Sequence, residues 1–466
     1  MASQVDLASG TTLGSTGQQA RWTVSPWGAV TPWGQRDPET LDWYVAADDR
    51  WHVPAQEPTV RQERVDGAPV VETRIRIPDG DAVQRVWGVS DVDGTVVVEF
   101  ENESPMPVAV ALTGPQVVTE RPPADVPIQG IELDGEVIVL PVGHRSTVRV
   151  ALPFPGGHFP AAGLFRVPPA MAVVRGWTRV VEQASRLVLP DERLVHAVAA
   201  ARCDLLLEGP VDPAEDLVGF LLDVAELVRC GDAAEPWLVE VVEPAERIAR
   251  LAAKRSSPGD TVAEASEALR AVRLIAHRAG DRRAAGDIDR LRSRVQQTRS
   301  DVSRGHGVIT SFADLRRGRS VGRFVRSIER RIVDGGRFLT GGIPTGWLGE
   351  NFEVHGLPTS ASTTASFAIR WHGERPAVLW EQQGDEPVEL TAPDIDPGWS
   401  TSERSGETLW SVPDGVSPRR AGLQLSVDAA GRQAEAGPAP SAHPTEQPAT
   451  AHDPDPDGPG AGPSFT

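Results

Sequence analysis

The segment Ser366–Glu381 reads SFAIRWHGERPAVLWE and contains the clearest β-hairpin pattern of the chain. Two apolar runs flank a four-residue loop, Gly373–Pro376, and this arrangement is typical of two adjacent antiparallel strands. The pairs expected across this loop are Trp371 with Val378, and Ile369 with Trp380.

Side chains of the hairpin alternate between two faces, because successive residues of a strand point in opposite directions. The apolar face is expected to carry Phe367, Ile369, Trp371, Val378 and Trp380. The other face is expected to carry Arg370, His372, Leu379 and Glu381. We expect Arg370 and Glu381 to form a cross-strand ion pair.

Two interpretations of the polar face stay open. In the first, Glu381 or His372 serves as the acid or base of an enzyme. In the second, Glu381 belongs to a solvated ion pair and His372 is a turn residue, and this simpler interpretation is favoured. Catalytic residues are therefore unidentified, with Glu381 and His372 as the candidates.

Composition narrows the classes of protein. A chain of 466 residues is long enough for two or three domains with their own cores. Its net charge of -19 argues against nucleic acid as a partner. Lys254 is the single lysine beside many arginines. This bias is typical of a GC-rich bacterial genome, so arginine richness alone is poor support for phosphate binding.

The chain lacks a basic start followed by an apolar run, and it lacks an apolar stretch of about 18 residues. We therefore expect a cytoplasmic protein with no membrane partner. Cys203 and Cys230 lie in apolar helical patterns and are expected to be buried free thiols. No His or Cys cluster has zinc-ligand spacing, so neither a metal nor a cofactor is predicted.

Pattern and composition predict an α+β multidomain chain. Short alternating segments with turn signals indicate an antiparallel β-sandwich, and a later 3.6-residue period indicates helices joined by short connections. The expected regions are a disordered leader at 1–20, a β-sandwich domain at 21–168, antiparallel α-helical hairpins at 169–335, a Gly-rich linker at 336–349, a small antiparallel β region at 350–415 and a disordered tail at 430–466.

Individual elements follow from the same signals. Sandwich strands are expected at 70–77, 84–89, 95–100, 108–112, 136–140 and 147–152. Helices are expected near 171–189, from Asp191 to Gly209, from Asp212 to Gly231, and at 235–255, 260–279 and 281–299. Pro244 is expected to kink or split its helix.

Residues 22–52 contain five tryptophans. A flat aromatic ring can pack against the apolar side of a sugar ring, and carboxylates can accept hydrogen bonds from its hydroxyls. This segment is therefore a candidate carbohydrate site. The candidate ligand-binding residues are Trp27, Trp33, Trp43, Trp51, Asp42 and Asp48. The favoured alternative is that the tryptophans fill the core of the sandwich.

An arginine-rich stretch spans residues 278–331. It holds fifteen arginines and six acidic residues, a local charge of +9. Binding to nucleic acid is one interpretation. The favoured one is a solvated face or pairing with this chain's own carboxylates, because only Phe312 and Phe324 could stack on bases there.

The order of sandwich, helical hairpins and small β region resembles that of bacterial glycoside hydrolases and phosphorylases built on an α/α toroid of six helical hairpins. The resemblance covers residues 21–412 as architecture only, and no catalytic motif of that family can be placed on this chain. The helical region suffices for about three hairpins. The resemblance therefore implies a carbohydrate-related protein that is weakly catalytic or non-catalytic.

Three hypotheses follow. The first is a carbohydrate-associated protein, either glycan-binding or a degenerate glycosidase. The second is an intracellular scaffold or regulatory interaction protein that binds a protein partner and has no small-molecule substrate. The third is an acid–base hydrolase that uses the late hairpin. The sequence does not specify an oligomeric state.

Overall fold

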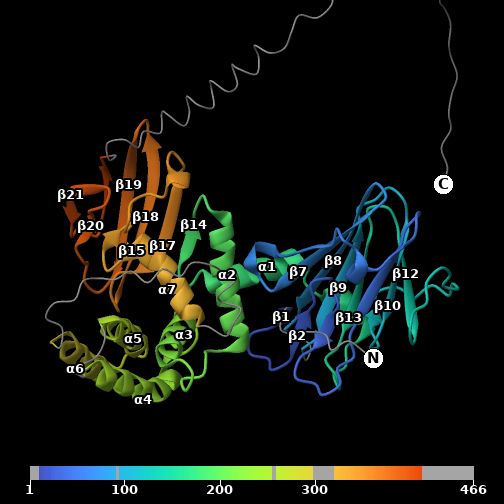
Figure 1. Ribbon diagram of the computed structural model, residues 1–466, viewed down its shortest axis with the longest axis horizontal. Helices are drawn as coiled ribbons and strands as arrows, with labels where there is room; N and C mark the ends of the chain where they lie inside the picture. The colour runs from blue at the N-terminus through green and yellow to red at the C-terminus, as the bar shows by residue number, and fades with distance from the viewer. Residues whose placement is uncertain (1–9, 91–93, 254–258, 298–319, 412–466) are drawn as a thin grey trace, which may run out of the picture. The chain divides into compact units, whose positions relative to one another are not determined.

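The computed structural model describes residues 10–90, 94–253, 259–297 and 320–411 (Figure 1). Within them an N-terminal set of strands is followed by helices and then by a C-terminal set of strands, which confirms the α+β multidomain class. The predicted tail at 430–466 lies outside the described residues. So does much of the arginine-rich stretch, at 298–319.

The N-terminal region is built from short strands in three sheets. Its strands are β1 (Thr11–Gly14), β2 (Arg21–Val24), β3 (Val30–Pro32), β4 (Asp42–Ala46), β5 (Trp51–His52), β6 (Arg61–Arg64), β7 (Val70–Ile77), β8 (Gly80–Gly88), β9 (Val96–Asn102), β10 (Val108–Thr113), β11 (Val118–Thr119), β12 (Val137–Val142) and β13 (Thr147–Leu152). Short 3-10 turns lie at Pro54–Gln56, Val65–Gly67 and Ala161–Arg166.

Two of these sheets are antiparallel and share one apolar core. Their strand orders are β12-β10-β4-β5 and β11-β13-β9-β8-β7-β6. Trp43 on β4, Phe100 on β9 and Leu140 on β12 are almost fully buried in this core. Alternating apolar residues on facing sheets produce the sandwich-like packing that the sequence predicted.

The six-stranded sheet is buried on its second face as well. There Val70, Trp87 and Val97 pack against Val174 and Trp177 of the first helix. Neighbouring residues of β8 such as Val86 and Trp87 are therefore both buried. A strand covered on both faces loses the simple alternation of a half-exposed one.

The leader expected at 1–20 is wrong for its described part. Residues 11–14 form β1, which pairs with β2 in antiparallel register. Leu13 is fully buried against the sandwich core. A polar, small-residue composition suggested disorder, but one buried leucine and a paired neighbour order this segment.

Seven helices are described: α1 (Ala170–Val181), α2 (Glu192–Glu208), α3 (Leu217–Arg229), α4 (Ala234–Ala252), α5 (Gly259–Arg278), α6 (Arg282–Gln297) and α7 (Val321–Ile332). Helix α5 packs against α3, α4 and α6, and α3 also packs against α7. Their shared apolar core includes Leu221, Val241 and Leu269. Helix α7 approaches α3 closely at Gly322, where a Cβ atom would lie 2.4 Å from the backbone of Leu222.

Helix boundaries confirm some of the sequence signals and correct others. Asp191 caps α2 as expected, since its side chain accepts a hydrogen bond from the Leu194 amide. The expected start at Asp212 is wrong: α3 begins four residues later, with Asp216 as its cap. Asp216 also receives hydrogen bonds from Arg323 of α7, a tertiary contact that stabilises the later start. Helix α4 runs through Pro244 and is not split.

The C-terminal strands, drawn in orange and red in Figure 1, form two further sheets, and the earlier strand β14, drawn in green, joins the first of them. One has the order β14-β17-β18-β19-β22 and the other β15-β16-β20-β21. Their bounds are β14 (Arg186–Val188), β15 (Val333–Asp334), β16 (Arg337–Phe338), β17 (Phe352–Pro358), β18 (Thr363–His372), β19 (Arg375–Gly384), β20 (Leu390–Ala392), β21 (Asp396–Thr401) and β22 (Ser405–Leu409).

Two expected boundaries of this region are wrong. Strand β14 lies inside the helix expected at 171–189, and it pairs with β17. The linker expected at 336–349 contains β16, whose Phe338 is fully buried, and a 3-10 turn at Thr345–Trp347. A strand of two or three residues has too short a pattern to be recognised, and only its partner strand defines it.

The hairpin predicted at residues 366–381 is present, but its register differs from the predicted one by two residues. Strand β18 pairs Ile369 with Val378 and Trp371 with Pro376, so the turn contains only Gly373 and Glu374. Gly373 has a φ of 64°, which suits the first central position of a two-residue hairpin turn. A shift of two residues leaves every side chain on its predicted face. Accordingly, Phe367, Ile369, Val378 and Trp380 are buried.

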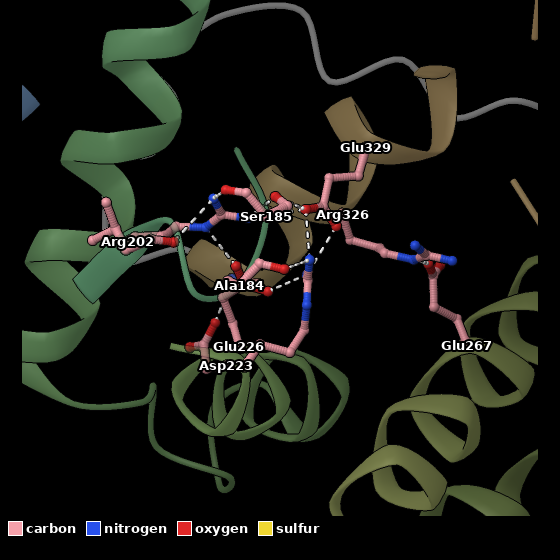
Figure 2. A network of polar contacts seen from close by, with 11 residues as sticks. Ala184, Ser185, Arg202, Asp223, Glu226, Glu267, Arg326 and Glu329 are labelled. Carbon is pink, nitrogen blue, oxygen red and sulfur yellow. Dashed lines mark hydrogen bonds and ion pairs between the residues drawn. The ribbon is translucent and has the colours of Figure 1, made fainter. Parts of the chain in front are cut away.

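A buried network of two arginines and two glutamates joins the helices, as Figure 2 shows. Glu329 of α7 accepts hydrogen bonds from Arg202 of α2 at 2.9 Å and from Arg229 of α3 at 2.7 Å. Glu226 of α3 also accepts from both arginines, at 2.7 and 2.6 Å. The four side chains are at most 7 % exposed, so their charges balance where water does not reach them.

The same network binds the chain between α1 and β14. Arg202 donates to the carbonyl and the hydroxyl of Ser185, and Arg229 donates to the carbonyl of Ala184. Ser185 in turn donates its hydroxyl to Glu329. Polar groups buried in a low dielectric need such complete pairing, and here nearly every donor finds an acceptor.

We predict that Glu329→Gln destabilises the protein by about 3–5 kcal/mol at neutral pH, because it leaves two buried arginines with one carboxylate. Burial would raise the pKa of Glu329, but the charges of Arg229 and Arg202 outweigh burial and lower it to about 2 from an ordinary 4.5. The stabilisation is thus present above pH 4.5 and is lost as the pH falls toward 2. Urea unfolding at several pH values measures both effects.

Glu246→Gln is the matched control. Glu246 is exposed on the surface of α4 and pairs with Arg250 at 3.4 Å, so its loss should change stability by about 0.5 kcal/mol or less. Equal effects of the two substitutions at neutral pH would contradict the role assigned to the buried network.

Candidate functional site

The tryptophans of residues 22–52 do not meet on one surface. Trp22 and Trp43 are buried in the sandwich core. Trp43 donates its indole N–H to the carbonyl of Trp27 at 2.9 Å, and Trp51 donates to the carbonyl of Gln129 at 2.8 Å. Trp33 is 60 % exposed. The arrangement therefore matches the core-filling interpretation for Trp22 and Trp43 and leaves Trp33 as a single exposed ring.

The acidic candidates of the same segment are also separate. Asp42 is half-buried on β4, where burial raises its pKa, and Asp48 is exposed in the following turn. His52 is buried, with one ring nitrogen 3.1 Å from Glu57 and the other 3.0 Å from Asp49. Arg50 completes this cluster by donating to Glu57. These contacts tie the β4–β5 turn to the 3-10 turn at Pro54–Gln56.

The late hairpin does not bring its two catalytic candidates together. His372 is opposite Arg375 beside the turn, whereas Glu381 is opposite Ser366, six residues along β18. Six residues of a strand span about 20 Å. Both side chains are exposed.

The expected ion pair between Arg370 and Glu381 is wrong. Arg370 donates instead to Glu353 of the neighbouring β17 at 2.6 Å, and this bond, followed by that of His355, lowers the pKa of Glu353. Because β17 flanks β18 on the side away from Glu381, the sheet supplied a partner that a two-stranded hairpin could not reveal.

A different site lies between the helices and the C-terminal sheets. A cavity of about 640 Å³ is lined by residues of α3, α5, α6 and α7 and by two segments of the C-terminal strands, Pro358–Ser362 and Asp385–Val388. We call it the arginine cavity. Its charged lining residues are Arg229, Arg270, Arg273, Arg292, Arg326, Glu226, Glu267, Asp289, Asp385 and Glu386.

Each carboxylate on the helical wall is shared by two arginines. Glu267 of α5 accepts from Arg326 at 3.2 Å and from Arg330 at 3.1 Å, both on α7. Figure 2 shows Arg326 extending toward Glu267 from the same helix that carries Glu329. Asp289 of α6 accepts from Arg273 at 2.8 Å and from Arg292 at 3.3 Å. The arginines on this wall therefore outnumber the carboxylates that pair with them.

Arg270 of α5 makes no ion pair within the described residues. Its guanidinium donates to the carbonyl of Ser266, in its own helix, at 3.4 Å. Desolvation lowers the pKa of Arg270 most, the charges of Arg326 and Arg330 lower it further, and the charges of Glu267 and Asp334 raise it. The residue as a whole is exposed. Two more donors of the cavity, Nη1 of Arg326 and Nε of Arg292, are buried without a hydrogen-bond partner in the described chain.

The lining segment that follows β19 carries two acidic residues. Asp385 and Glu386 are exposed, and their backbone carbonyls are held by Arg404 and Thr363. Apolar residues complete the lining, among them Leu222, Ala225, Ala271 and Leu274. We call these apolar residues the apolar floor of the cavity, the helical arginines its cationic wall, and Asp385 and Glu386 its acidic rim.

Sequence reasoning missed this site. The arginine-rich stretch 278–331 includes Arg292 and Arg326, but Arg270 and Arg273 lie before it. One signal was present: Glu267, Arg270 and Leu274 are three and four residues apart and so share one face of a helix. Among the described arginines of the stretch, Arg292, Arg323, Arg326 and Arg330 pair with this chain's own carboxylates, as the favoured interpretation expected.

Comparison with known proteins assigns no family. No protein-family model matches the sequence, and no curated protein matches it either. Within the described residues no three His, Cys, Asp or Glu side chains are placed to hold a metal ion. In the same part of the chain no helix is long and apolar enough to cross a bilayer.

Cys203 and Cys230 are buried free thiols, as the sequence predicted. Burial raises the pKa of each to about 12. Because the thiolate is the reactive form, we predict that neither thiol of the native protein reacts with Ellman's reagent at pH 8 over minutes, whereas both react in 8 M urea. Rapid reaction of either thiol in the native state would contradict the packing of α2 and α3.

Proposed function

We propose that this chain is a ligand-binding protein whose small-molecule ligand occupies the arginine cavity. The observation that carries the proposal is the cavity itself, since about 640 Å³ lies within the range of ligand pockets and charged groups converge on an apolar floor. The site also lies between two packed regions, where such pockets concentrate.

Binding is favoured over hydrolysis by the state of the carboxylates on the helical wall of the cavity. Glu226, Glu267 and Asp289 are each bonded to two arginines, so none is left to donate a proton to a substrate or to attack one. A glycosidase needs two carboxyl groups that flank the scissile bond with different protonation states. The cavity's wall instead holds carboxylates as partners of arginines.

This proposal departs from the hypothesis of a scaffold or regulatory interaction protein, which had no small-molecule substrate. The cavity is bounded by α3 and α7 on one side and by the β17–β18 turn on the other, so a ligand would contact both helices and sheet. It would stabilise their packing by mass action, because it binds the folded form alone.

The carbohydrate-binding hypothesis stays a second candidate because of Trp33. Its ring is 60 % exposed, in the turn after β3, and one exposed aromatic ring can stack on a sugar. No other tryptophan of the segment is comparably exposed, so the cavity is the stronger site.

One ligand screen separates the two candidates. We predict that a library of small molecules and oligosaccharides, tested by thermal unfolding, yields compounds that raise the unfolding temperature by a few degrees. For a cavity ligand, Ala271→Trp should abolish the rise because the indole fills the cavity, while Trp33→Ala should leave it unchanged. Ala271→Met is the smaller version, in case the indole disturbs folding.

The opposite pattern, with stabilisation lost in Trp33→Ala and kept in Ala271→Trp, would favour the glycan site. If no compound at millimolar concentration stabilises the wild-type chain, or if cavity filling changes no response, the proposed ligand site is wrong.

A further inference from the structure

The arginine cavity has more cationic hydrogen-bond donors than its own acceptors satisfy. A guanidinium carries five N–H donors. Arg270 uses one of them, in a 3.4 Å bond to its own helix, and Nη1 of Arg326 is buried without a partner in the described chain. Arg270 is exposed, so water reaches its remaining donors. The Arg326 donor has lost water without gaining an acceptor, and this costs free energy.

Electrostatic repulsion adds to this cost. Arg326 and Arg330 lie close enough to Arg270 to disfavour its charge, and Glu267, which opposes this repulsion, is already bonded to both of them. The other residue near this group, Asp334, is bonded to Arg330 at 3.2 Å. An anion placed against Arg270 and Arg326 would relieve the repulsion and accept from the unused donors.

We propose that the ligand of the arginine cavity carries a phosphate or carboxylate group, and that Arg270 and Arg326 bind this group. The inference rests on the proposed ligand site and specifies its chemistry. A guanidinium group can form bidentate hydrogen bonds with two oxygens of either anion, which fixes the orientation of the ligand as well as neutralising its charge. The apolar floor around Ala271 and Leu274 would receive the uncharged part of the same molecule.

The acidic rim sets a limit on this recognition. Asp385 and Glu386 belong to the part of the lining that follows β19, and their side chains make no hydrogen bond within the described residues. Their negative charge opposes an incoming anion and so weakens binding of ions that carry several charges. Removing it should strengthen anion binding, whereas removing Arg270 should weaken it.

The test is isothermal titration of the full chain with pyrophosphate, inorganic phosphate and succinate, at constant ionic strength held with chloride. The first two probes represent phosphate, and the third represents carboxylate. We expect at least one probe to bind the wild-type protein in a single saturable step. Arg270→Gln should weaken that probe about tenfold or more, as expected for loss of hydrogen bonds to a charged group.

Three variants complete the design. Arg270→Lys keeps the charge but loses the planar fork, and it should fall between the wild type and Arg270→Gln. The control is Arg250→Gln. Arg250 is exposed on α4 and does not line the cavity, so this substitution should leave binding unchanged. The double variant Asp385→Asn, Glu386→Gln should bind the probe more tightly than the wild type. Circular dichroism confirms that each variant is folded.

The outcomes separate this inference from the proposed function. If no probe binds, but compounds from the screen stabilise the wild type and not Ala271→Trp, the ligand site stands and its anionic chemistry is wrong. If a probe binds wild type, Arg270→Gln and Arg250→Gln equally, binding is non-specific and the inference is overturned. If neither probes nor screened compounds respond to any cavity variant, both proposals fail.

Discussion

The buried pairing of Arg202 and Arg229 with Glu226 and Glu329 is the interaction on which the rest of this structure depends. It joins α2, α3 and α7 and holds the chain that leads into β14, so one charge-balanced cluster links the helices to an edge of the C-terminal sheet. Charges of this kind persist without water only when every group is paired. Their geometry therefore allows little freedom in how the three helices meet.

The arginine cavity is placed by that network. Glu226 and Arg229 belong both to the network and to the lining of the cavity. Arg326 lies on the same helix as Glu329, three residues earlier, and points toward Glu267 on α5 (Figure 2). A cationic wall held by buried ion pairs cannot easily rearrange, and such preorganisation reduces the cost of ordering side chains when a ligand binds.

Local patterns predicted much of the fold and little of the site. The two-residue alternation assigned the faces of the 366–381 hairpin correctly. Its register is set by the two-residue turn at Gly373, whereas the sequence suggested a four-residue loop. Cap residues predicted α2, and tertiary pairing of Asp216 with Arg323 shifted the start of α3. The tryptophans drew attention to residues 22–52, yet Trp22 and Trp43 lie in the core. The one local signal at Arg270, its helix face shared with Glu267 and Leu274, did not distinguish it from other helical arginines.

By itself the sequence determined most of the helices and the longer strands, which of their faces are apolar, and that both cysteines are buried, because each depends on neighbours within a few turns or residues. Only the tertiary structure decided which charges meet. Arg202 and Glu329 are 127 positions apart, and so many arginines are present that no pattern distinguishes a buried partner from a solvated one. Ion pairs and cavities form where elements distant in the sequence pack together. Which residues meet there depends on the tertiary contacts and not on the residues next to them in the chain.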